Sequence, residues 1–366
     1  MTNPLLSPLK LRNLNLSNRI GVSPMCQYSS VDGFATDWHL VHLGSRAVGG
    51  AGLVMAEASA VTPEGRITPA DLGIWQDAHI EQLARIVRFL HSQGARAGIQ
   101  LAHAGRKASM APPAQGEHLL TAAEGGWTPV APSAIAFSEK YATPHALDEA
   151  GISLVIEAFR AAAVRALKAG FDLVEIHAAH GYLLHEFLSP LSNHRTGAYG
   201  GSLENRARLL LQVVDAVRGV WPEEKPLFVR ISATDWTEGG WTADDSVALA
   251  RLLKEHGVDL VDCSSGGNVA GAKIPLAPGY QVEFAARIRR EAEIATAAVG
   301  LITTPAQAAT IIANGEADLV LLAREMLRDP YFAVHAAQAL GEAAAWPEQY
   351  LRAAPAGSVV RAAIEE

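Results

Sequence analysis

The sequence predicts an α/β protein of the closed, parallel (β/α)8 type, a TIM barrel. Short apolar runs recur eight times along the chain, and amphipathic or alanine-rich stretches typical of helices separate most of them. Few of these runs alternate between polar and apolar residues, which is typical of strands buried on both faces. No strand is followed by the G-x-G-x-x-G motif that an open dinucleotide-binding sheet would carry.

The predicted elements follow one another in a regular order. We predict strands at Ile20–Met25, Gly52–Ala58, Arg96–Leu101, Asp172–His177, Leu227–Ile231, Val258–Cys263, Ile294–Gly300 and Asp318–Ala323. We predict helices at Ile80–Ser92, Leu154–Ala169, Leu203–Val220, Asp244–Glu255, Gln281–Glu291, Pro305–Ala313 and Tyr331–Leu340. Glycines stand where helices would end in the left-handed conformation, at Gly94, Gly170, Gly257 and Gly315. Strand and helix repeated eight times favour a closed barrel, with an open doubly wound sheet as the alternative.

We interpret residues 1–366 as one barrel domain, because no linker or fixed-period repeat divides the chain. Residues 104–150 are rich in proline and glycine and predict a long excursion between the third and fourth strands. Such an excursion would lie over the mouth of the barrel. The tail from about residue 346 is rich in proline, alanine and charge, so we expect either an exchanged arm or a frayed end.

The amino-acid composition of the chain argues against several classes of function. The chain has 38 acidic and 30 basic residues and a formal net charge of −8, which argues against binding to nucleic acid or to an anionic membrane surface. Its two cysteines cannot form a disulfide framework. No apolar run approaches the roughly 20 residues that span a bilayer, and the N-terminus lacks the pattern of a signal peptide. We therefore expect a cytoplasmic protein.

The end of the predicted fourth strand concentrates polar chemistry. His177, His180 and Tyr182 follow a buried apolar run, and Glu175 points to the same side of the strand as His177. Active sites of parallel barrels form at the carboxyl ends of the strands. Three interpretations are open: a metal site, a structural histidine pair, or two donors to one substrate oxygen with Tyr182 as a nearby proton donor.

Two earlier strands also end in polar residues. The first has Pro24 near its end, which stiffens the turn, and is followed by Cys26 and Tyr28, whose simpler interpretation is packing. The third carries Gln100 and continues into His103-Ala-Gly-Arg106-Lys107. One amide, one imidazole and two cations suit the carbonyl and N–H edge of a heterocycle, although the two cations could equally begin a solvated loop.

The later strands add cations. Arg230 lies inside an apolar strand, where a buried charge needs either an acidic partner or a functional role. Its permanent charge would stabilise an anion that develops on a cofactor ring. The last two strands end near Gly300 and at Ala323-Arg324. In barrels these two loops often bind a phosphate through backbone N–H groups and an arginine. An anion partner is the better interpretation of Arg324, because a cation is unfavourable beside a helix N-terminus.

These motifs, in this order and spacing, resemble the old yellow enzyme family, most closely its bacterial branch of xenobiotic reductases and NADPH dehydrogenases. The motifs are Ser23-Pro24-Met25-Cys26, Glu57-Ala58, Gln100 to Lys107, His177-Ala-Ala-His180-Gly-Tyr182, Asn193 to Arg206 and Phe228-Val-Arg230. The resemblance covers nearly the whole chain. It implies a barrel with non-covalent FMN that reduces C=C bonds of α,β-unsaturated carbonyl or nitro compounds by ping-pong hydride transfer, with NADPH as reductant and NADH as the alternative.

The resemblance also implies roles for individual residues. Contacts to the flavin ring fall on Ser23, Pro24, Met25, Cys26, Ala58, Gln100 and Arg230, and contacts to the phosphate on Gly300, Ala323 and Arg324. His177 and His180 would bind the substrate oxygen, Tyr28 would line the pocket, Tyr182 would donate the proton, and Cys26 would tune the flavin. Phenols are expected ligands besides activated alkenes.

Three further points follow from the resemblance. The phosphate site usually reads Gly-Arg, whereas this chain has Ala323-Arg324, which adds a methyl group where the backbone approaches the phosphate. The segment Met110 to Trp127 is longer than in the shortest relatives. In this branch a C-terminal arginine reaches the active site of a neighbouring subunit, and Arg352 matches it, so we expect a homodimer or homotetramer.

Competing functions predict different properties. A metal-dependent hydrolase would use His177, His180 and His103 as ligands, but the other strand ends carry no carboxylate cluster. A flavin module of the dienoyl-CoA reductase or trimethylamine dehydrogenase type needs a cysteine cluster for iron and sulfur, which two distant cysteines cannot supply. A binding protein without catalysis is the weakest alternative, because many polar groups converge at the strand ends.

Overall fold

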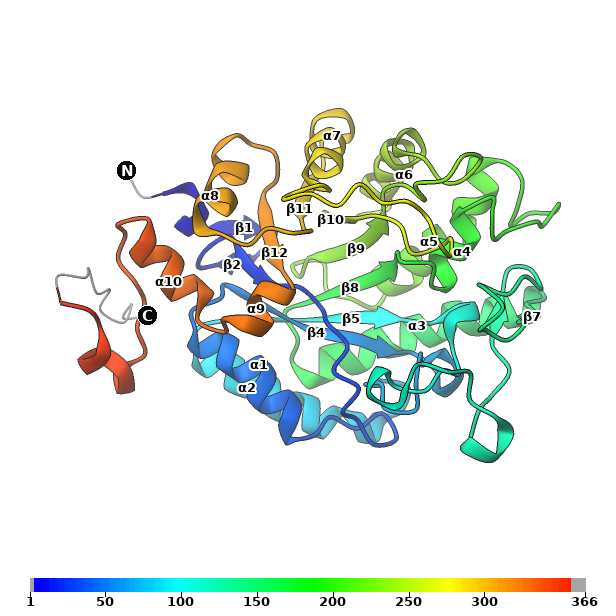
Figure 1. The fold of residues 1–366 in the computed structure, drawn as a ribbon, viewed down its shortest axis with the longest axis horizontal. Coiled ribbons are helices and arrows are strands. Elements are labelled where there is room, and N and C mark those ends of the chain that lie inside the picture. Colours follow the sequence, from blue (N-terminus) through cyan, green and yellow to red (C-terminus); the bar gives the residue numbers. More distant parts are fainter. Residues whose placement is uncertain (1–2, 357–366) are drawn as a thin grey trace.

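The core of the protein is a closed barrel of eight parallel strands, seen in the computed structural model, which describes residues 3–356 (Figure 1). In chain order the barrel strands are β3 (Ile20–Val22), β4 (Leu53–Ala60), β5 (Arg96–Ala102), β8 (Leu173–Ala178), β9 (Leu227–Ser232), β10 (Leu260–Ser264), β11 (Ala295–Ala298) and β12 (Leu319–Leu322). The last strand pairs with the first, with Val320 opposite Ile20, and this pairing closes the barrel. The predicted fold class is confirmed.

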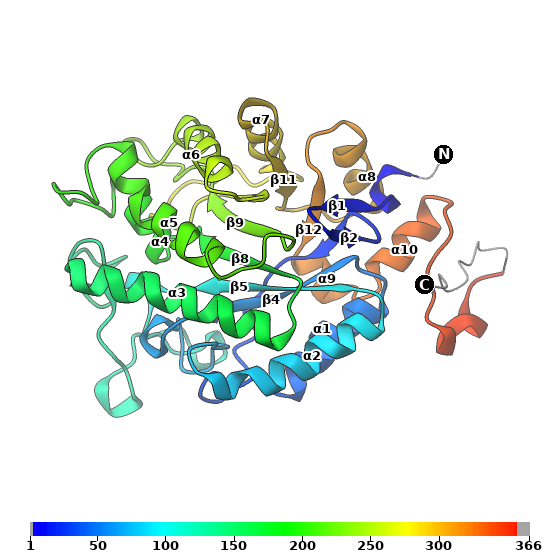
Figure 2. The ribbon, with the colours of Figure 1, turned by 180° about the vertical axis from the view of Figure 1, so that it is seen from behind.

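Helices surround the strands on the outside, as the views from the front and from behind show (Figures 1 and 2). They are α1 (Asp37–Val48), α2 (Ile80–Ser92), α3 (Glu149–Ala169), α4 (Leu183–Leu188), α5 (Leu203–Arg218), α6 (Ala243–Glu255), α7 (Val282–Ala292), α8 (Pro305–Ala313), α9 (Arg324–Arg328) and α10 (Phe332–Ala339). Their apolar faces pack on the outer faces of the strands; Phe159 of α3, for example, is fully buried in this layer. No helix among residues 3–356 is long and apolar enough to cross a membrane.

A hairpin closes the amino-terminal end of the barrel. Strands β1 (Leu9–Leu11) and β2 (Leu14–Leu16) pair antiparallel, and their leucines pack with Leu173, Phe228 and other side chains of the barrel interior. Burial of these apolar side chains removes water from that end of the barrel. The carboxyl ends of the strands are therefore the end at which a ligand can enter.

The excursion after β5 is anchored to neighbouring loops. It holds the two-residue strands β6 (Val130–Ala131) and β7 (His145–Ala146), which pair in parallel. The guanidinium of Arg66 lies between the rings of Trp75 and Trp127, 5.2 and 5.1 Å from their centres. This stacking, together with backbone hydrogen bonds such as Met110 N–H to the Ile67 carbonyl, holds the excursion beside the loop that follows β4.

The predicted elements agree with the structure, and the differences have local reasons. All eight predicted strands are present with ends shifted by a few residues, and the four helix-ending glycines have φ between +69° and +92°. Helix α3 begins at Glu149, five residues before the predicted start, because Asp148 caps it by accepting from Gly151 N–H. The excursion therefore ends at Asp148. Helix α1 and the β1–β2 hairpin were not predicted.

Candidate active site

His177, the next-to-last residue of β8, has a defined tautomer. Its Nδ1 accepts a hydrogen bond of 3.2 Å from the Ala179 N–H, so the ring proton resides on Nε2. Burial, together with the nearby Arg230 guanidinium, lowers the pKa of His177 well below its usual value. The imidazole is therefore neutral at physiological pH, with Nε2–H free to donate to a ligand.

His180 lies in the turn after β8 and faces the same space. Its ring packs edge-on against His177, with 5.1 Å between ring centres. Its Nε2 is hydrogen bonded to the Ser264 hydroxyl at 2.6 Å, and its backbone N–H donates to the Ser232 hydroxyl. Burial lowers the pKa of this ring as well. A neutral ring whose Nε2 accepts from Ser264 carries its proton on Nδ1, so this turn can present a second N–H donor.

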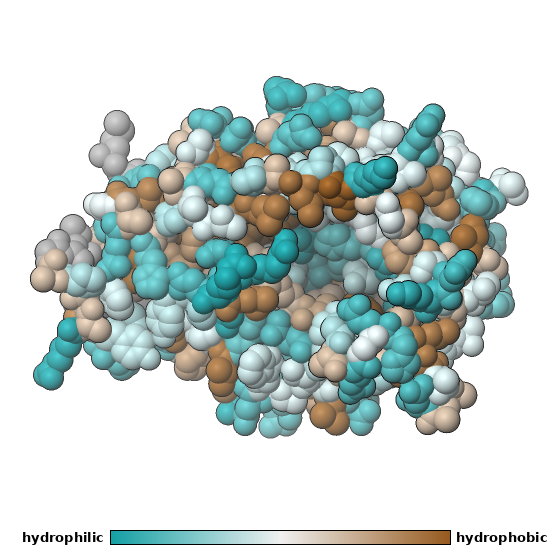
Figure 3. Space-filling model, in the orientation of Figure 1, coloured by the Kyte–Doolittle hydropathy of each residue, from teal (hydrophilic) through white to brown (hydrophobic). Residues whose placement is uncertain are grey.

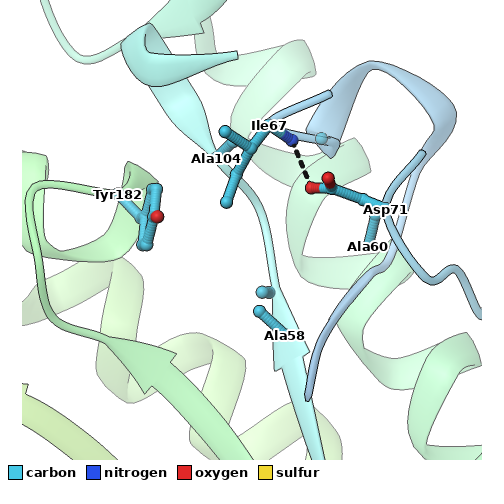
Figure 4. A pocket seen from close by; sticks show the side chains of 8 residues that line it. Ala58, Ala60, Ile67, Asp71, Ala104 and Tyr182 are labelled. Carbon is cyan, nitrogen blue, oxygen red and sulfur yellow. Dashed lines mark hydrogen bonds between the residues drawn. The ribbon is translucent and has the colours of Figure 1, made fainter. Parts of the chain in front are cut away.

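Tyr182 completes the turn. Its ring lies edge-on to His177 at 5.0 Å between centres, and burial raises the pKa of its phenol well above the usual value. The hydroxyl therefore keeps its proton and is chemically a donor. Figure 4 shows the ring entering a small cavity across from Ile67 and Asp71. The cavity is otherwise lined by small residues: Ala58, Ala60, Gly65, Ala102 and Ala104.

A polar layer lies inside the barrel beneath this turn. The Gln100 side chain donates from Nε2 to Glu175 Oε1 at 2.8 Å across the pairing of β5 with β8. Arg230 of β9 lies 3.0 Å from Asp262 Oδ2 on β10 and donates from Nη1 to the Ser23 hydroxyl. All five side chains are buried. The layer holds an amide and a permanent positive charge below the histidine pair.

The segment after β3 adds a thiol and a phenol. Pro24, Met25, Cys26 and Tyr28 are all partly buried on this segment. Burial raises the pKa of the Cys26 thiol well above its usual value, and the thiol is within reach of the Ala58 backbone. Cys26 is therefore a neutral thiol rather than a thiolate. Tyr28 has φ of +50°, a left-handed conformation that marks a sharp turn at this point of the chain.

The neighbouring strands β11 and β12 bring the remaining predicted residues to one rim. Gly300 has φ of +116°, and a Cβ added there would come within 2.6 Å of Gln281 Nε2. Only glycine fits this position. Ala323 directly precedes α9, and Arg324 is solvent-exposed and forms no ion pair with any residue in the described part of the chain. The space-filling view shows a hollow near the centre of the face turned to the viewer, in which hydrophilic residues predominate (Figure 3).

Comparison with known proteins identifies the family. Residues 4–342 match the NADH:flavin oxidoreductase / NADH oxidase family. The chain is 50% identical over 354 residues to NADPH dehydrogenase of Bacillus subtilis (strain 168), covering 96% of this chain and 99% of that protein. It is 52% identical over 355 residues to NADPH dehydrogenase of Halalkalibacterium halodurans, with the same coverage. The chain belongs to this family, the old yellow enzyme family.

Solved structures agree with this assignment. Morphinone reductase superposes with a TM-score of 0.78 at 30% identity and covers 94% of this chain and 91% of its own. A 2-naphthoyl-CoA reductase complex superposes with a TM-score of 0.84 at 25% identity over 93% of this chain. This chain spans only about half of that larger protein, 53% of its length. The protein is thus an FMN-dependent NADH or NADPH oxidoreductase of the old yellow enzyme type.

The residues present fit a flavin. The Gln100 side chain faces Glu175 with its Nε2, so its amide oxygen points the other way and receives no hydrogen bond from the described residues. It can accept from the imide N–H of a flavin ring. Arg230 supplies a positive charge for the carbonyl edge, and the left-handed Gly300 leaves room for close approach of a ligand to the backbone.

The cluster after β5 does not act as a unit. Of its four polar residues, Gln100 keeps an amide oxygen without a partner in the described structure, whereas both cations are engaged by neighbouring loops. His103 accepts the Gly105 N–H, Arg106 donates to the Asn268 carbonyl at 2.7 Å, and Lys107 donates to the carbonyls of His180 and Gly267. The two cations hold neighbouring loops together, so neither the heterocycle-binding nor the solvated-loop interpretation describes them.

Sequence reasoning missed the partners of the predicted residues. Asp262 beside Arg230 and Ser264 beside His180 lie on β10, far along the chain. A carboxylate inside the apolar run Leu260–Ser264 was the available signal for Asp262. His185 and Asp235, whose buried side chains lie 3.1 Å apart, had no comparable signal.

Arg352 remains apart from this site, and the metal-site interpretation finds no ligand group among the described residues. Arg352 is exposed and lies in a short 3-10 helix, Glu348–Ala353. This helix, drawn in red, lies beside α10 on the side of the barrel opposite the excursion (Figure 1). No contact among residues 3–356 brings Arg352 to the histidine pair. Within residues 3–356, no three His, Cys, Asp or Glu side chains are grouped as metal ligands would be.

Proposed function

We propose that this protein is an ene-reductase that uses NADPH to reduce the activated C=C bond of α,β-unsaturated carbonyl or nitro compounds in a ping-pong cycle. The observation that carries the proposal is the turn after β8. It presents two neutral imidazoles and a protonated phenol, packed edge to edge, above the layer formed by Gln100 and Arg230. The names of the bacterial relatives support NADPH as reductant.

The residues that would bind the cofactor lie at the carboxyl ends of the strands, around the mouth of the barrel. FMN, bound without a covalent link, would supply the hydride-transfer chemistry. Gln100 would accept from the imide N–H of the ring with its amide oxygen. Arg230 would bind the neighbouring carbonyl edge, with Ser23 holding Arg230 in place. The remaining ring contacts would come from Pro24, Met25, Cys26 and Ala58, and the phosphate contacts from Gly300, Ala323 and Arg324. Arg324 is exposed and unpaired among the described residues, as a residue that awaits an anion would be.

Substrate chemistry is assigned to the histidine turn. His177 and His180 would donate to the carbonyl or nitro oxygen and so polarise the double bond. Two well-placed donors of this kind contribute on the order of 3–4 kcal/mol each in comparable oxyanion sites. Tyr182 would deliver the proton to the α-carbon, since the raised pKa of its phenol keeps the proton on oxygen until it is needed.

Further parts of the proposal concern the pocket and the assembly. Tyr28 would line the substrate pocket, and the neutral thiol of Cys26 would lie against the ring and tune its potential. Arg352, exposed on a projecting segment, would enter the site of a neighbouring subunit in a homodimer or homotetramer. Activated alkenes and phenols are the proposed ligands, without nucleic acid or membrane partners, and the low cysteine count supports a cytoplasmic location.

The visible spectrum of the purified protein tests the proposal. Flavin absorption bands should bleach with NADPH under anaerobic conditions and return on addition of cyclohexenone. A phenol such as p-hydroxybenzaldehyde should add a long-wavelength charge-transfer band. Reoxidation by oxygen but not by cyclohexenone would refute the ene-reductase assignment. A colourless protein that also fails to take up FMN would contradict the assigned cofactor site.

A further inference from the structure

The turn that carries the histidine pair has an unusual backbone. His180 and Gly181 are consecutive residues with φ of +59° and +71°. A Cβ added to Gly181 would lie 2.3 Å from the Gly267 carbonyl oxygen. A non-glycine residue in the left-handed region costs free energy and persists only where surrounding groups hold it. The direction of the His180 ring therefore depends on what holds this turn.

Hydrogen bonds account for almost every backbone group of the turn. The N–H of His180 donates to Ser232, and its carbonyl accepts from Lys107 Nζ at 2.8 Å. Tyr182 N–H donates to the Ala179 carbonyl. These contacts fix the residues on either side of Gly181. None of these contacts engages the N–H of Gly181, which is buried and therefore needs a hydrogen-bond acceptor.

That acceptor is a histidine outside the substrate space. Gly181 N–H donates to His185 Nδ1 at 2.9 Å. His185 lies on α4, one turn further along the chain, and is fully buried. Because Nδ1 accepts, a neutral ring carries its proton on Nε2. The structure therefore places a third imidazole under the turn, in a role different from those of His177 and His180.

A buried carboxylate holds the other side of this ring. His185 Nε2 lies 3.1 Å from Asp235 Oδ1, and both side chains are fully buried. Neither of these two atoms has a regular hydrogen bond in the described structure, so the carboxylate faces the ring nitrogen without ideal hydrogen-bond geometry. Burial would raise the pKa of Asp235, but His185 and hydrogen bonds from Ser189 and the Trp241 N–H hold it to about 2. Asp235 thus stays charged and keeps the proton of His185 on the Nε2 side.

We propose that His185, oriented by Asp235, is a positioning residue that holds the His180–Gly181 turn in its left-handed conformation and thereby aims His180 and Tyr182 at the substrate. His185 does not touch the substrate, since it is fully buried behind the turn. The inference rests on the proposed roles of His180 and Tyr182. The inference goes further in one respect: these roles require a side chain at position 185 that accepts from the Gly181 N–H, and they do not require a particular charge there.

A matched pair of substitutions tests this inference. Glutamine at 185 can accept from Gly181 with its amide oxygen and direct its amide N–H groups toward Asp235, whereas leucine has similar bulk and no acceptor. The phenol affinity, read from the charge-transfer band, and the reoxidation rate with cyclohexenone are measured in both variants. We expect His185→Leu to weaken both by about 10- to 100-fold, and His185→Gln to stay within about threefold of the wild type. FMN content and affinity are the controls and should change little in either variant.

Several outcomes separate this inference from the proposed function. Wild-type phenol affinity in His185→Leu would overturn the inference, and so would an equal loss in His185→Gln with FMN retained. If His185→Leu fails to bind FMN, Asp235→Asn replaces it. That variant should weaken phenol binding several-fold, and unchanged affinity would overturn the role of Asp235. A wild-type protein that gives no phenol band at all would refute the proposed function instead.

Discussion

Gln100 donates its side-chain N–H to Glu175 Oε1 at 2.8 Å in the interior of the barrel, where both side chains are buried. This hydrogen bond settles which end of the amide faces the cofactor space. With Nε2 engaged, the oxygen is the atom available to a flavin N–H. The other carboxyl oxygen, Glu175 Oε2, is buried without a hydrogen-bond partner in the described structure. Glu175 therefore orients the Gln100 amide, and the removal of Oε2 from water costs free energy of folding.

Replacing Glu175 should therefore change cofactor affinity according to the acceptor that remains. Glu175→Gln keeps an oxygen that accepts from Gln100, and we expect FMN affinity near that of the wild type. Glu175→Leu removes the acceptor and lets the Gln100 amide rotate, so FMN should bind about tenfold more weakly, the equivalent of one lost hydrogen bond. Fluorescence titration of the apoprotein with FMN measures both. Equal affinities in all three proteins would contradict the assigned orientation of Gln100.

Buried carboxyl groups should make stability depend on pH. Burial raises the pKa of Glu186 to about 8 from a usual value near 4.5. Between these values the folded state binds a proton that the unfolded state has released, so this group lowers the free energy of unfolding as pH rises from about 4.5 to about 8. Glu186→Gln removes the titration and keeps an acceptor for the Arg106 N–H. In urea unfolding, the variant should gain stability relative to the wild type as pH rises across this range, and a constant difference would contradict the raised pKa.

Glycine substitutions separate backbone strain from steric contact at the histidine turn. Gly181 and Gly94 have similar positive φ of +71° and +79°, but only Gly181 has a carbonyl oxygen within 2.3 Å of an added Cβ, and Gly94 has open space. Gly94→Ala should cost about 1–2 kcal/mol of stability and leave phenol binding unchanged. Gly181→Ala should in addition weaken phenol binding by tenfold or more, because the turn must move. Thermal unfolding and phenol titration distinguish the two, and similar phenol affinity in both variants would argue against a tightly packed turn.

The phosphate site can be tested with two flavins. Arg324→Ala removes an exposed cation from the rim formed by β11 and β12. FMN should bind the apoprotein about 10- to 100-fold more weakly, because a charge-assisted hydrogen bond to phosphate is worth roughly 1.5–3 kcal/mol. Riboflavin, which lacks the phosphate, should bind as it does to the wild type. A parallel loss of riboflavin affinity would place Arg324 in a structural role.

The proton donor should show itself in only one half of the catalytic cycle. Tyr182→Phe keeps the ring that packs against His177 and removes the hydroxyl. Reoxidation of the reduced enzyme by cyclohexenone should slow by about 10²- to 10⁴-fold, whereas reduction by NADPH should be nearly unchanged. Stopped-flow absorbance resolves the two steps. Equal slowing of both would mean that Tyr182 does not act as the acid.

Local patterns account for the parts of the site that the sequence predicted. His177, His180 and Tyr182 lie within six residues at the end of one apolar run, so their proximity needs no knowledge of the fold. The eight apolar runs and their helix-ending glycines predicted the barrel, because strand and helix periodicities are local properties of a chain. Helix α1 was not predicted because its inward face includes His39, His42 and Arg46, and buried polar residues obscure the apolar periodicity.

The sequence by itself determined the barrel, its strand ends and the identity of the groups at its mouth. Tertiary structure decided their partners: Gln100 with Glu175, Arg230 with Asp262, His180 with Ser264 and His185 with Asp235. In the same order, the paired residues are 75, 32, 84 and 50 positions apart in the sequence, so no local pattern specifies them. Closure of the barrel brings neighbouring strands into register and removes water. A buried polar group must then find its partner within the protein, and that partner sets its tautomer, charge and direction.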